Sequence, residues 1–214
     1  MKSEENINSY HFSTEEKTEA VSYEQIAEVL HDAHRSNIEK GMRFASAFIT
    51  GEEIREEVGE EGTIYLIRQE AEIAAVGAIK YRQWNKWFCK DSLCGNIFLV
   101  GVREKYKGYG LSKMMYHKLE EIIFQKCEIA TMNTAVNNTI MLQSRLHDGW
   151  RYVDYFSHKG VDFYSIMLAK WRDQCPYSNR ECQYRYYIRK AIVKIQKNSS
   201  GEFRKWVKVI RRKR

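Results

Sequence analysis

A short stretch with two glycines and several basic residues is the part of the sequence best suited to bind an anion. Residues 103–112 read R-E-K-Y-K-G-Y-G-L-S, between the apolar residues 96–102 and a segment with a helical repeat. A strand that turns into a helix through glycines brings backbone N–H groups and the positive end of the helix dipole together. Such a turn binds phosphate or pyrophosphate, and Arg103, Lys105 and Lys107 add positive charge beside it.

Two common phosphate-binding motifs do not match this turn. The sequence has no G-x-x-x-x-G-K-[ST] P-loop, and the third glycine of the dinucleotide-binding G-x-G-x-x-G is missing. Taken alone, the turn therefore fits two interpretations equally: an anion site, or an ordinary strand-to-helix connection with solvated lysines.

The cysteines and histidines form neither a metal-binding nor a disulfide pattern. The cysteines are odd in number and have no C-x-x-C spacing; they are Cys89, Cys94, Cys127, Cys175 and Cys182. His31 and His34 lie three apart on an expected helix, without Cys or carboxylate partners at ligand spacing, so we expect no metal. The polar, acidic residues 1–24 do not resemble a secretory signal, so we expect reduced thiols and a cytoplasmic protein.

The elements expected around the turn make an α/β fold with a mixed central sheet flanked by helices. Hydrophobic periodicity predicts helices from residue 22 and over 52–58, 112–126 and 138–146, and strands over 63–68, 73–81, 96–102, 127–133, 152–157 and 163–168. The first strands follow one another directly, whereas helices join the later ones. Residues 96–102 are almost wholly apolar, which indicates a central strand buried on both faces. Residues 84–94 are expected to be a loop or a turn, and residues 1–20 to be frayed.

The net charge of +7 is unevenly distributed along the chain. Residues 1–62 carry a net −9, residues 63–170 a net +5, and residues 171–214 a net +11. We therefore divide the chain into a polar N-terminal segment (1–21), a folded domain (22–170) and a basic tail (171–214).

The basic tail contains two amphipathic segments that predict a C-terminal helical extension. The first has apolar residues at helical spacing: Tyr184, Tyr187, Ile188, Ala191, Ile192 and Ile195. The second follows a capping-box pattern at 199–202 and has Phe203, Trp206, Val207 and Ile210. Three partners fit this tail: the domain itself or a second subunit, which would make a homodimer; an anionic membrane surface contacted by residues 180–214; and, least favoured, nucleic acid.

Two motifs resemble those of the GCN5-related N-acetyltransferase (GNAT) family. The family's acetyl-CoA motif, [RQ]-x-x-G-x-[GA] after an apolar strand, resembles residues 107–112, with Lys107 at the Arg/Gln position and Ser112 at the Gly/Ala position. A second family motif, an Asn followed eleven residues later by Gly and an aromatic residue, resembles Asn138 with Gly149 and Trp150. The resemblance spans about residues 22–170, with the elements in the family's order.

The resemblance implies that acetyl-CoA binds as a co-substrate between two splayed parallel strands, 96–102 and 129–133. It implies that the backbone of Val100 and Val102 holds the pantetheine arm, and that Asn138 contacts CoA. The backbone amides that it assigns to the pyrophosphate are those of Lys107, Gly108, Tyr109, Gly110, Leu111 and Ser112.

The same resemblance leaves the catalytic residues unassigned. Acetyl transfer to an amine needs a base, a donor that polarises the thioester and a proton for the leaving thiolate. In the family a tyrosine seven residues after the Asn often supplies that proton. Here Arg145, or Ser144 counted from the preceding Asn, stands there, and an arginine does not readily donate a proton. Ser144, a relayed water, Tyr152 and Tyr164 stay open as donors. The expected central strand has no glutamate, which leaves Asn96 to position a water.

The resemblance places the acceptor pocket between the first two helices and the last hairpin. In this chain these are the acidic segment 31–61, with His34 and Glu39, and the loop 157–162. An acidic wall favours a cationic amine. We therefore predict an acetyl-CoA-dependent N-acetyltransferase that acts on a primary amine of a small molecule, such as an amino sugar or an amino acid. The alternative is a non-catalytic protein of the same fold whose basic tail binds a membrane surface or another anionic partner.

Overall fold

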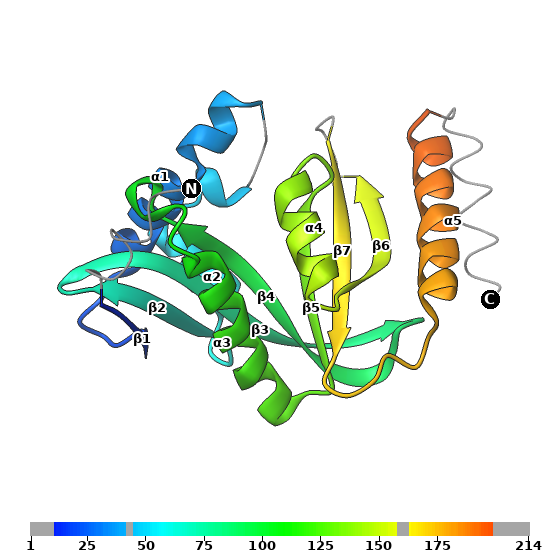
Figure 1. Cartoon of the computed structure of the whole chain (residues 1–214), viewed down its shortest axis with the longest axis horizontal. Helices are drawn as coiled ribbons and strands as arrows, with labels where there is room; N and C mark the ends of the chain where they lie inside the picture. Colours follow the sequence, from blue (N-terminus) through cyan, green and yellow to red (C-terminus); the bar gives the residue numbers. More distant parts are fainter. Residues whose placement is uncertain (1–10, 42–44, 158–162, 199–214) are drawn as a thin grey trace. The chain divides into compact units, whose positions relative to one another are not determined.

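The computed structural model describes residues 11–41, 45–157 and 163–198 (Figure 1). Its helices are α1 (Tyr23–Glu39), α2 (Gly51–Val58), α3 (Leu111–Lys126), α4 (Thr139–His147) and α5 (Asn179–Asn198), with short 3-10 helices η2 (Ala45–Ala47) and η3 (Glu104–Tyr106). Its strands are β1 (Phe12–Glu16), β2 (Thr63–Gln69), β3 (Glu72–Lys86), β4 (Cys89–Val102), β5 (Ile129–Ala135), β6 (Arg151–Ser157) and β7 (Tyr164–Trp171). The strands follow the order β1-β2-β3-β4-β5-β7-β6. The predicted mixed α/β fold is confirmed.

The chain forms two compact units. The first comprises Met1–Met132 with Trp171–Asp173, and the second comprises Asn133–Lys170 with Gln174–Arg214. In the first unit β1 to β4 are antiparallel neighbours, and β4 pairs in parallel with the start of β5. In the second unit β6 and β7 are antiparallel, and α5 packs on β6. Within the ranges described, no helix is long and apolar enough to cross a membrane.

The first helices begin where the sequence supplies a cap. The hydroxyl of Ser22 accepts from the N–H of Gln25, and the Gln25 side chain accepts from the N–H of Ser22, which is a complete capping box at the start of α1. Thr50 and Glu53 form the same reciprocal pair at the start of α2. The predicted helix start at residue 22 is confirmed.

Helices α1 and α3 cover opposite faces of the first unit's sheet, and glycines let both come close. A Cβ added to Gly101 would lie 3.0 Å from side-chain atoms of α1. On the other face, a Cβ added to Gly77 would lie 2.8 Å from Met115, and one added to Gly95 would lie 2.5 Å from Ile123. Real Cβ contacts are longer than this, so α3 holds its position only because these two residues have no side chain.

Two predictions about this sheet were wrong. Residues 84–94 are not a loop or a turn along their whole length, because β3 and β4 continue as one long hairpin that pairs Trp84 with Ser92. Only residues 87–88, at the tip of the hairpin, form a turn. The ring of Phe88 lies edge-on to Trp84 and Trp87, and these contacts stabilise the hairpin end despite its polar sequence. Residues 12–16 are not frayed either, since they form β1, which is antiparallel to β2.

Helix α5 covers the first of the two predicted tail segments. The second, with Phe203, Trp206, Val207 and Ile210, lies outside the described residues, as do its capping-box pattern and residues 158–162 of the predicted acceptor loop.

Candidate functional site

The central strand β4 pairs with β5 over only part of its length. The parallel pairs run from Cys94 with Ile129 to Ile97 with Met132, whereas β4 continues to Val102. Two residues beyond the last pair, Leu99 has a φ of 54° in the left-handed region, which favours glycine. The register with β3 also shifts opposite this segment. A β-bulge therefore marks the point where the ladder of pairs ends.

The residues of β4 beyond Ile97 are apolar, but they are less buried than expected. Phe98, Leu99, Val100 and Val102 are half-buried, so the prediction that the whole strand is buried on both faces was wrong. The N–H of Arg103 donates to the carbonyl of Ala74 on β3 at 2.9 Å. Neighbouring residues of a strand direct their N–H groups to opposite edges, so the N–H of Val102 faces away from β3. This edge presents backbone polar groups beside apolar side chains.

Asn96 has a structural role at the paired end of β4. Its side chain is buried, and Nδ2 donates to Oγ1 of Thr131 at 3.0 Å and to the Thr131 carbonyl at 3.3 Å. These bonds tie β4 to β5 across the parallel pairing. The amide that we expected to position a water is therefore engaged with the neighbouring strand.

The predicted anion turn lies between η3 and α3. Gly108 has a φ of 91°, and Gly110, the N-cap of α3, has a φ of 78°. No described side chain caps the helix, and no heavy atom of the described residues lies within 4 Å of a Cβ built on either glycine. Among the described residues, the first amides of α3, starting at Leu111 and Ser112, therefore have no capping side chain and lie at the positive end of the helix dipole. This donor set suits a phosphate group.

The basic side chains of the turn are paired with carboxylates in the same unit. Lys107 donates to Oε2 of Glu104 at 2.7 Å and to Oγ of Ser36 on α1 at 2.9 Å. Lys105 forms an ion pair with Glu72, and its hydrogen bond is the main cause of the lowered pKa of the Glu72 carboxyl. These acidic partners were not predicted, although the i, i+3 spacing of Glu104 and Lys107 is a signal in the sequence. The backbone amides are thus the main anion donors of the turn.

His34, named with the acceptor wall, is buried in α1. Its Nε2 lies 2.9 Å from Oγ of Ser46, and its Nδ1 lies 3.5 Å from Nδ2 of Asn37. Burial, followed by the charges of Lys107 and His31, lowers the pKa of His34 to about 4, so the imidazole is neutral near pH 7. Among the described residues, no cluster of three His, Cys, Asp or Glu is arranged to hold a metal.

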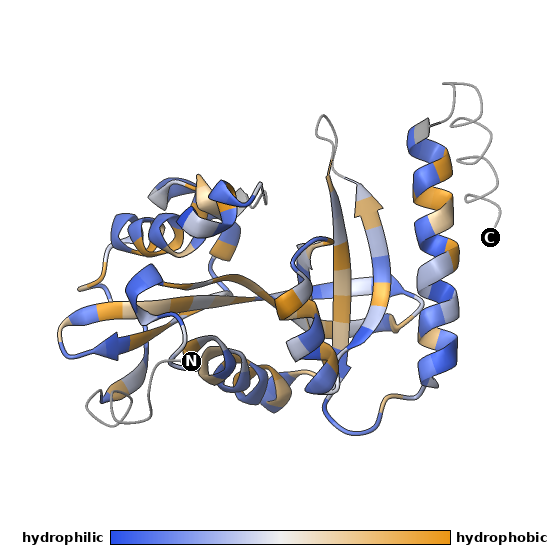
Figure 2. Ribbon diagram, turned by 45° about the horizontal axis from the view of Figure 1, so that its top comes forward, coloured by the Kyte–Doolittle hydropathy of each residue, from blue (hydrophilic) through white to orange (hydrophobic). Residues whose placement is uncertain are grey.

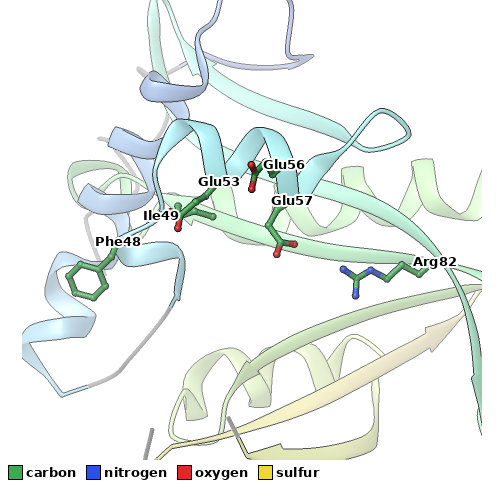
Figure 3. Close-up of a pocket in the computed structure, with 6 residues that line it drawn as sticks. All are labelled: Phe48, Ile49, Glu53, Glu56, Glu57 and Arg82. Carbon is green, nitrogen blue, oxygen red and sulfur yellow. The ribbon is translucent and has the colours of Figure 1, made fainter. Parts of the chain in front are cut away.

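An open pocket of about 810 Å³ lies against the acidic helix α2. It is lined by Phe48, Ile49, Glu53, Glu56, Glu57 and Arg82 (Figure 3). The three glutamates come from α2, which lies within the predicted acidic wall, and Phe48 just before the helix is 71% exposed. Arg82 on β3 was not predicted, because it lies just beyond the strand expected over 73–81. The lining combines carboxylates with an exposed aromatic ring, a combination that suits an organic cation.

The second unit contains the remaining residues of the family motifs. The Nδ2 of Asn138, just before α4, donates to Oγ1 of Thr134 at 3.1 Å. Arg145 is only 2% exposed, and its Nη2 lies 2.9 Å from Oδ2 of Asp148. An arginine held in a buried ion pair is a structural residue, whereas Ser144 next to it is exposed.

The two tyrosines considered as proton donors are part of an aromatic cluster. The ring of Tyr152 stacks on Tyr186 of α5 with centroids 4.8 Å apart, and burial raises the pKa of Tyr152 above its usual value. The ring of Tyr164 stacks on Tyr155 with centroids 5.2 Å apart. Both rings therefore contribute to the packing of the second unit.

The fold is shared with solved N-acetyltransferase structures. The ribosomal-protein-S18-alanine N-acetyltransferase from Escherichia coli is 11% identical, with a TM-score of 0.57 over 77% of this chain and 96% of that one. A candidate phosphinothricin N-acetyltransferase is 12% identical, with a TM-score of 0.57 over 77% and 100%. NAA60 from Arabidopsis thaliana in complex with acetyl-CoA is 13% identical, with a TM-score of 0.56 over 77% and 100%.

The sequence comparisons give the family itself. No curated protein matches this chain. The sequence model of the acetyltransferase (GNAT) family, however, matches residues 23–143, which is more than half of the chain and includes both the glycine turn and Asn138. With this match and with a seven-stranded mixed sheet that carries an uncapped glycine turn, the chain belongs to the acetyltransferase (GNAT) family.

Proposed function

We propose that the protein is an N-acetyltransferase that takes an acetyl group from acetyl-CoA and transfers it to a primary amine of a small molecule. The observation that carries this proposal is the end of β4. Its pairing with β5 stops at Ile97, its apolar residues beyond that point are half-buried, and it leads into a glycine turn whose helix amides no described side chain caps. An extended ligand with an apolar arm and a pyrophosphate matches both parts of this surface.

The residues present fit acetyl-CoA, which supplies an acetyl group already activated as a thioester. The backbone of Val100 and Val102 lines the edge along which the pantetheine arm would lie. The amides of residues 108–112 would hold the pyrophosphate, whereas the N–H of Lys107 donates to the carbonyl of Glu104 at 3.2 Å. That Asn138 contacts CoA stays a prediction from the family resemblance. Backbone N–H groups of β4 would stabilise negative charge that develops on the acetyl oxygen.

The acceptor proposed for the open pocket is a cationic amine. Glu53, Glu56 and Glu57 bring three carboxylates to one helix, and Lys80 and Arg82 are the neighbouring cations. Phe48 at the exposed side offers a ring face to an ammonium group. An amine must lose a proton before it attacks, and a carboxylate or a water held by one would accept that proton. The E. coli enzyme named above is a ribosomal-protein-S18-alanine N-acetyltransferase, so peptide amines are the acceptor class to compare with small amines.

The decisive experiment measures CoA binding and thiol release together. A Lys107→Glu variant would place two carboxylates, Glu104 and the new one, at the turn, and we expect at least a tenfold weaker affinity for CoA by calorimetry. Lys118→Glu makes the same charge change further along α3, and its affinity should match that of the parent protein. Undiminished CoA affinity in Lys107→Glu would show that the turn is not the pyrophosphate site.

The second candidate function is that of a non-catalytic interaction protein, and an activity assay distinguishes it from an N-acetyltransferase. The observation in its favour is Arg145, whose position in the family motif often holds a tyrosine and which here forms a buried ion pair. An acetyl-CoA assay with a panel of amines, including polyamines, amino sugars and short peptides, reports thiol release directly. CoA binding without thiol release for any amine would favour the non-catalytic protein.

A further inference from the structure

Helix α5 has two apolar faces, and one of them packs on β6. Its inner face contacts β6 through Cys182, Tyr186 and Val193, which are all buried. Its outer stripe repeats at i, i+3, i+4, i+7 and i+11 and consists of Tyr184, Tyr187, Ile188, Ala191 and Ile195. At 100° per residue the outer stripe points directly away from the inner face. Its tyrosines and isoleucines are between 42% and 67% exposed.

The inner face is firmly attached, so the outer stripe is a surface of the folded protein. Nε of Arg189 lies 2.9 Å from Oδ1 of Asp154 on β6. Tyr186 stacks on Tyr152, and the ammonium groups of Lys190 and Lys197 lie over tyrosine rings of the same unit. A helix fixed in this way cannot turn its apolar outer stripe inward. Figure 2 shows hydrophobic positions interspersed with hydrophilic ones along α5.

The charge around the outer stripe is strongly positive. Helix α5 has six Lys and Arg residues against one acidic residue, Glu181, which pairs with Arg185. Exposed cations flank the stripe at Arg180, Arg185 and Lys194. Residues 199–214 continue the pattern in sequence, with seven Lys and Arg against one Glu and with Phe203 and Trp206 among the apolar residues.

We propose that the outer stripe of α5 binds the surface of an anionic lipid membrane. A second copy of α5 would bring another strongly positive segment against this face, and the like charges would oppose that contact. Anionic lipid headgroups neutralise the lysines and arginines, while the isoleucines and tyrosines enter the interfacial layer. Nucleic acid would neutralise the charge but would leave the isoleucines in water. The protein thus lies on the membrane through its second unit.

The test is co-sedimentation of the full chain with vesicles of phosphatidylcholine, alone or mixed with phosphatidylglycerol. We expect binding to the mixed vesicles only, weakened by added salt. A Tyr184→Ser, Ile188→Ser double variant should partition about tenfold less, because it removes apolar surface from the membrane contact. The control double variant, Gln183→Ser with Gln196→Ser, alters the same helix outside the stripe and should bind as the parent does. Circular dichroism confirms that each variant is folded.

Five results would overturn the proposal. Parent protein that stays in solution with both kinds of vesicle does not use a lipid surface. Equal binding of the double variant and its control would show that the outer stripe does not contact the membrane. Loss of binding in the Phe203→Ser, Trp206→Ser variant alone would assign the membrane contact to residues 199–214. A dimer in sedimentation velocity that Ile188→Ser dissociates would make a second copy the occupant. A mobility shift on arbitrary duplex DNA, abolished by Lys194→Glu and unchanged in the Tyr184, Ile188 variant, would favour nucleic acid.

Discussion

His34 shows how burial changes the chemistry of a single residue in α1. The imidazole is 8% exposed, contacts Ser46 and Asn37, and has a pKa of about 4 against an ordinary value of 6.5. Because the folded state disfavours the charged ring, His34 costs no stability above about pH 6.5, and stability falls as the pH drops from 6.5 toward 4. His34 is therefore a pH-sensitive packing residue of the first unit.

This titration predicts a difference that unfolding experiments can measure. Between pH 7 and pH 5 the parent protein should lose about 2 kcal/mol of unfolding free energy through His34. His34→Gln keeps polar contacts to Ser46 and removes this part of the pH dependence. Urea denaturation at the two pH values gives the comparison, and His117→Gln on the exposed surface of α3 is the control. An equal pH dependence in His34→Gln and the parent would contradict the prediction.

At the scale of elements, the junction of β4 and β5 is held by side chains as well as by backbone pairs. Asn96 and Thr131 are both buried and hydrogen-bonded to each other. Asn96→Ala should lower the unfolding free energy by about 1–3 kcal/mol, because it leaves a buried polar partner unsatisfied.

A double-mutant cycle with Thr131→Val assigns this loss to the pair. We expect a coupling of about 1 kcal/mol from urea denaturation of the four proteins. Asn96→Ala combined with Thr139→Val, at an exposed position of α4, should be additive. A coupling near zero between Asn96 and Thr131 would mean that each contributes through other contacts.

The elements differ in how far the sequence could predict them. The capped helices follow from local patterns such as Ser22 with Gln25, and the glycine turn follows from the spacing of Gly108 and Gly110. The end of the β3–β4 hairpin could not be predicted, because contacts between aromatic rings outweigh its polar residues. The hydrogen-bond partner of Asn96 could not be predicted either, because Thr131 lies 35 residues away and only the parallel pairing of β4 with β5 brings the two residues together.

At the scale of the whole molecule, the division of charge and the division of structure do not coincide. The sequence separates a domain ending at residue 170 from a basic tail, yet α5 belongs to the same compact unit as β6. Shortening the chain at residue 170 would remove the helix that covers β6. A comparison of membrane binding is therefore better made with point variants than with that truncation.

The contribution of α5 to stability can be measured with two tyrosines on one helix. Tyr186 is 5% exposed and stacks on Tyr152, whereas Tyr184 is on the outer stripe. Tyr186→Ala should lower the unfolding free energy by about 3–5 kcal/mol, and Tyr184→Ala should change it by less than about 0.5 kcal/mol. Thermal and urea denaturation provide the measurement. Similar losses in the two variants would mean that α5 does not pack on β6 through its inner face.

Gly77 and Gly95 lie beneath α3, and they influence the position of the glycine turn at the start of that helix. The helix is about 24 Å long, and the Cβ of a Gly95→Ala variant would meet Ile123 near its far end. We expect the added methyl to cost about 1–3 kcal/mol of stability and to tilt α3, which would weaken CoA binding in calorimetry although residue 95 does not belong to the turn. Restored affinity in Gly95→Ala with Ile123→Ala would identify the tilt as the cause, and unchanged affinity in Gly95→Ala would exclude it. Substitution of Gly77 or Gly95 is thereby restricted by the orientation of α3, which positions the distant turn, as much as by local packing.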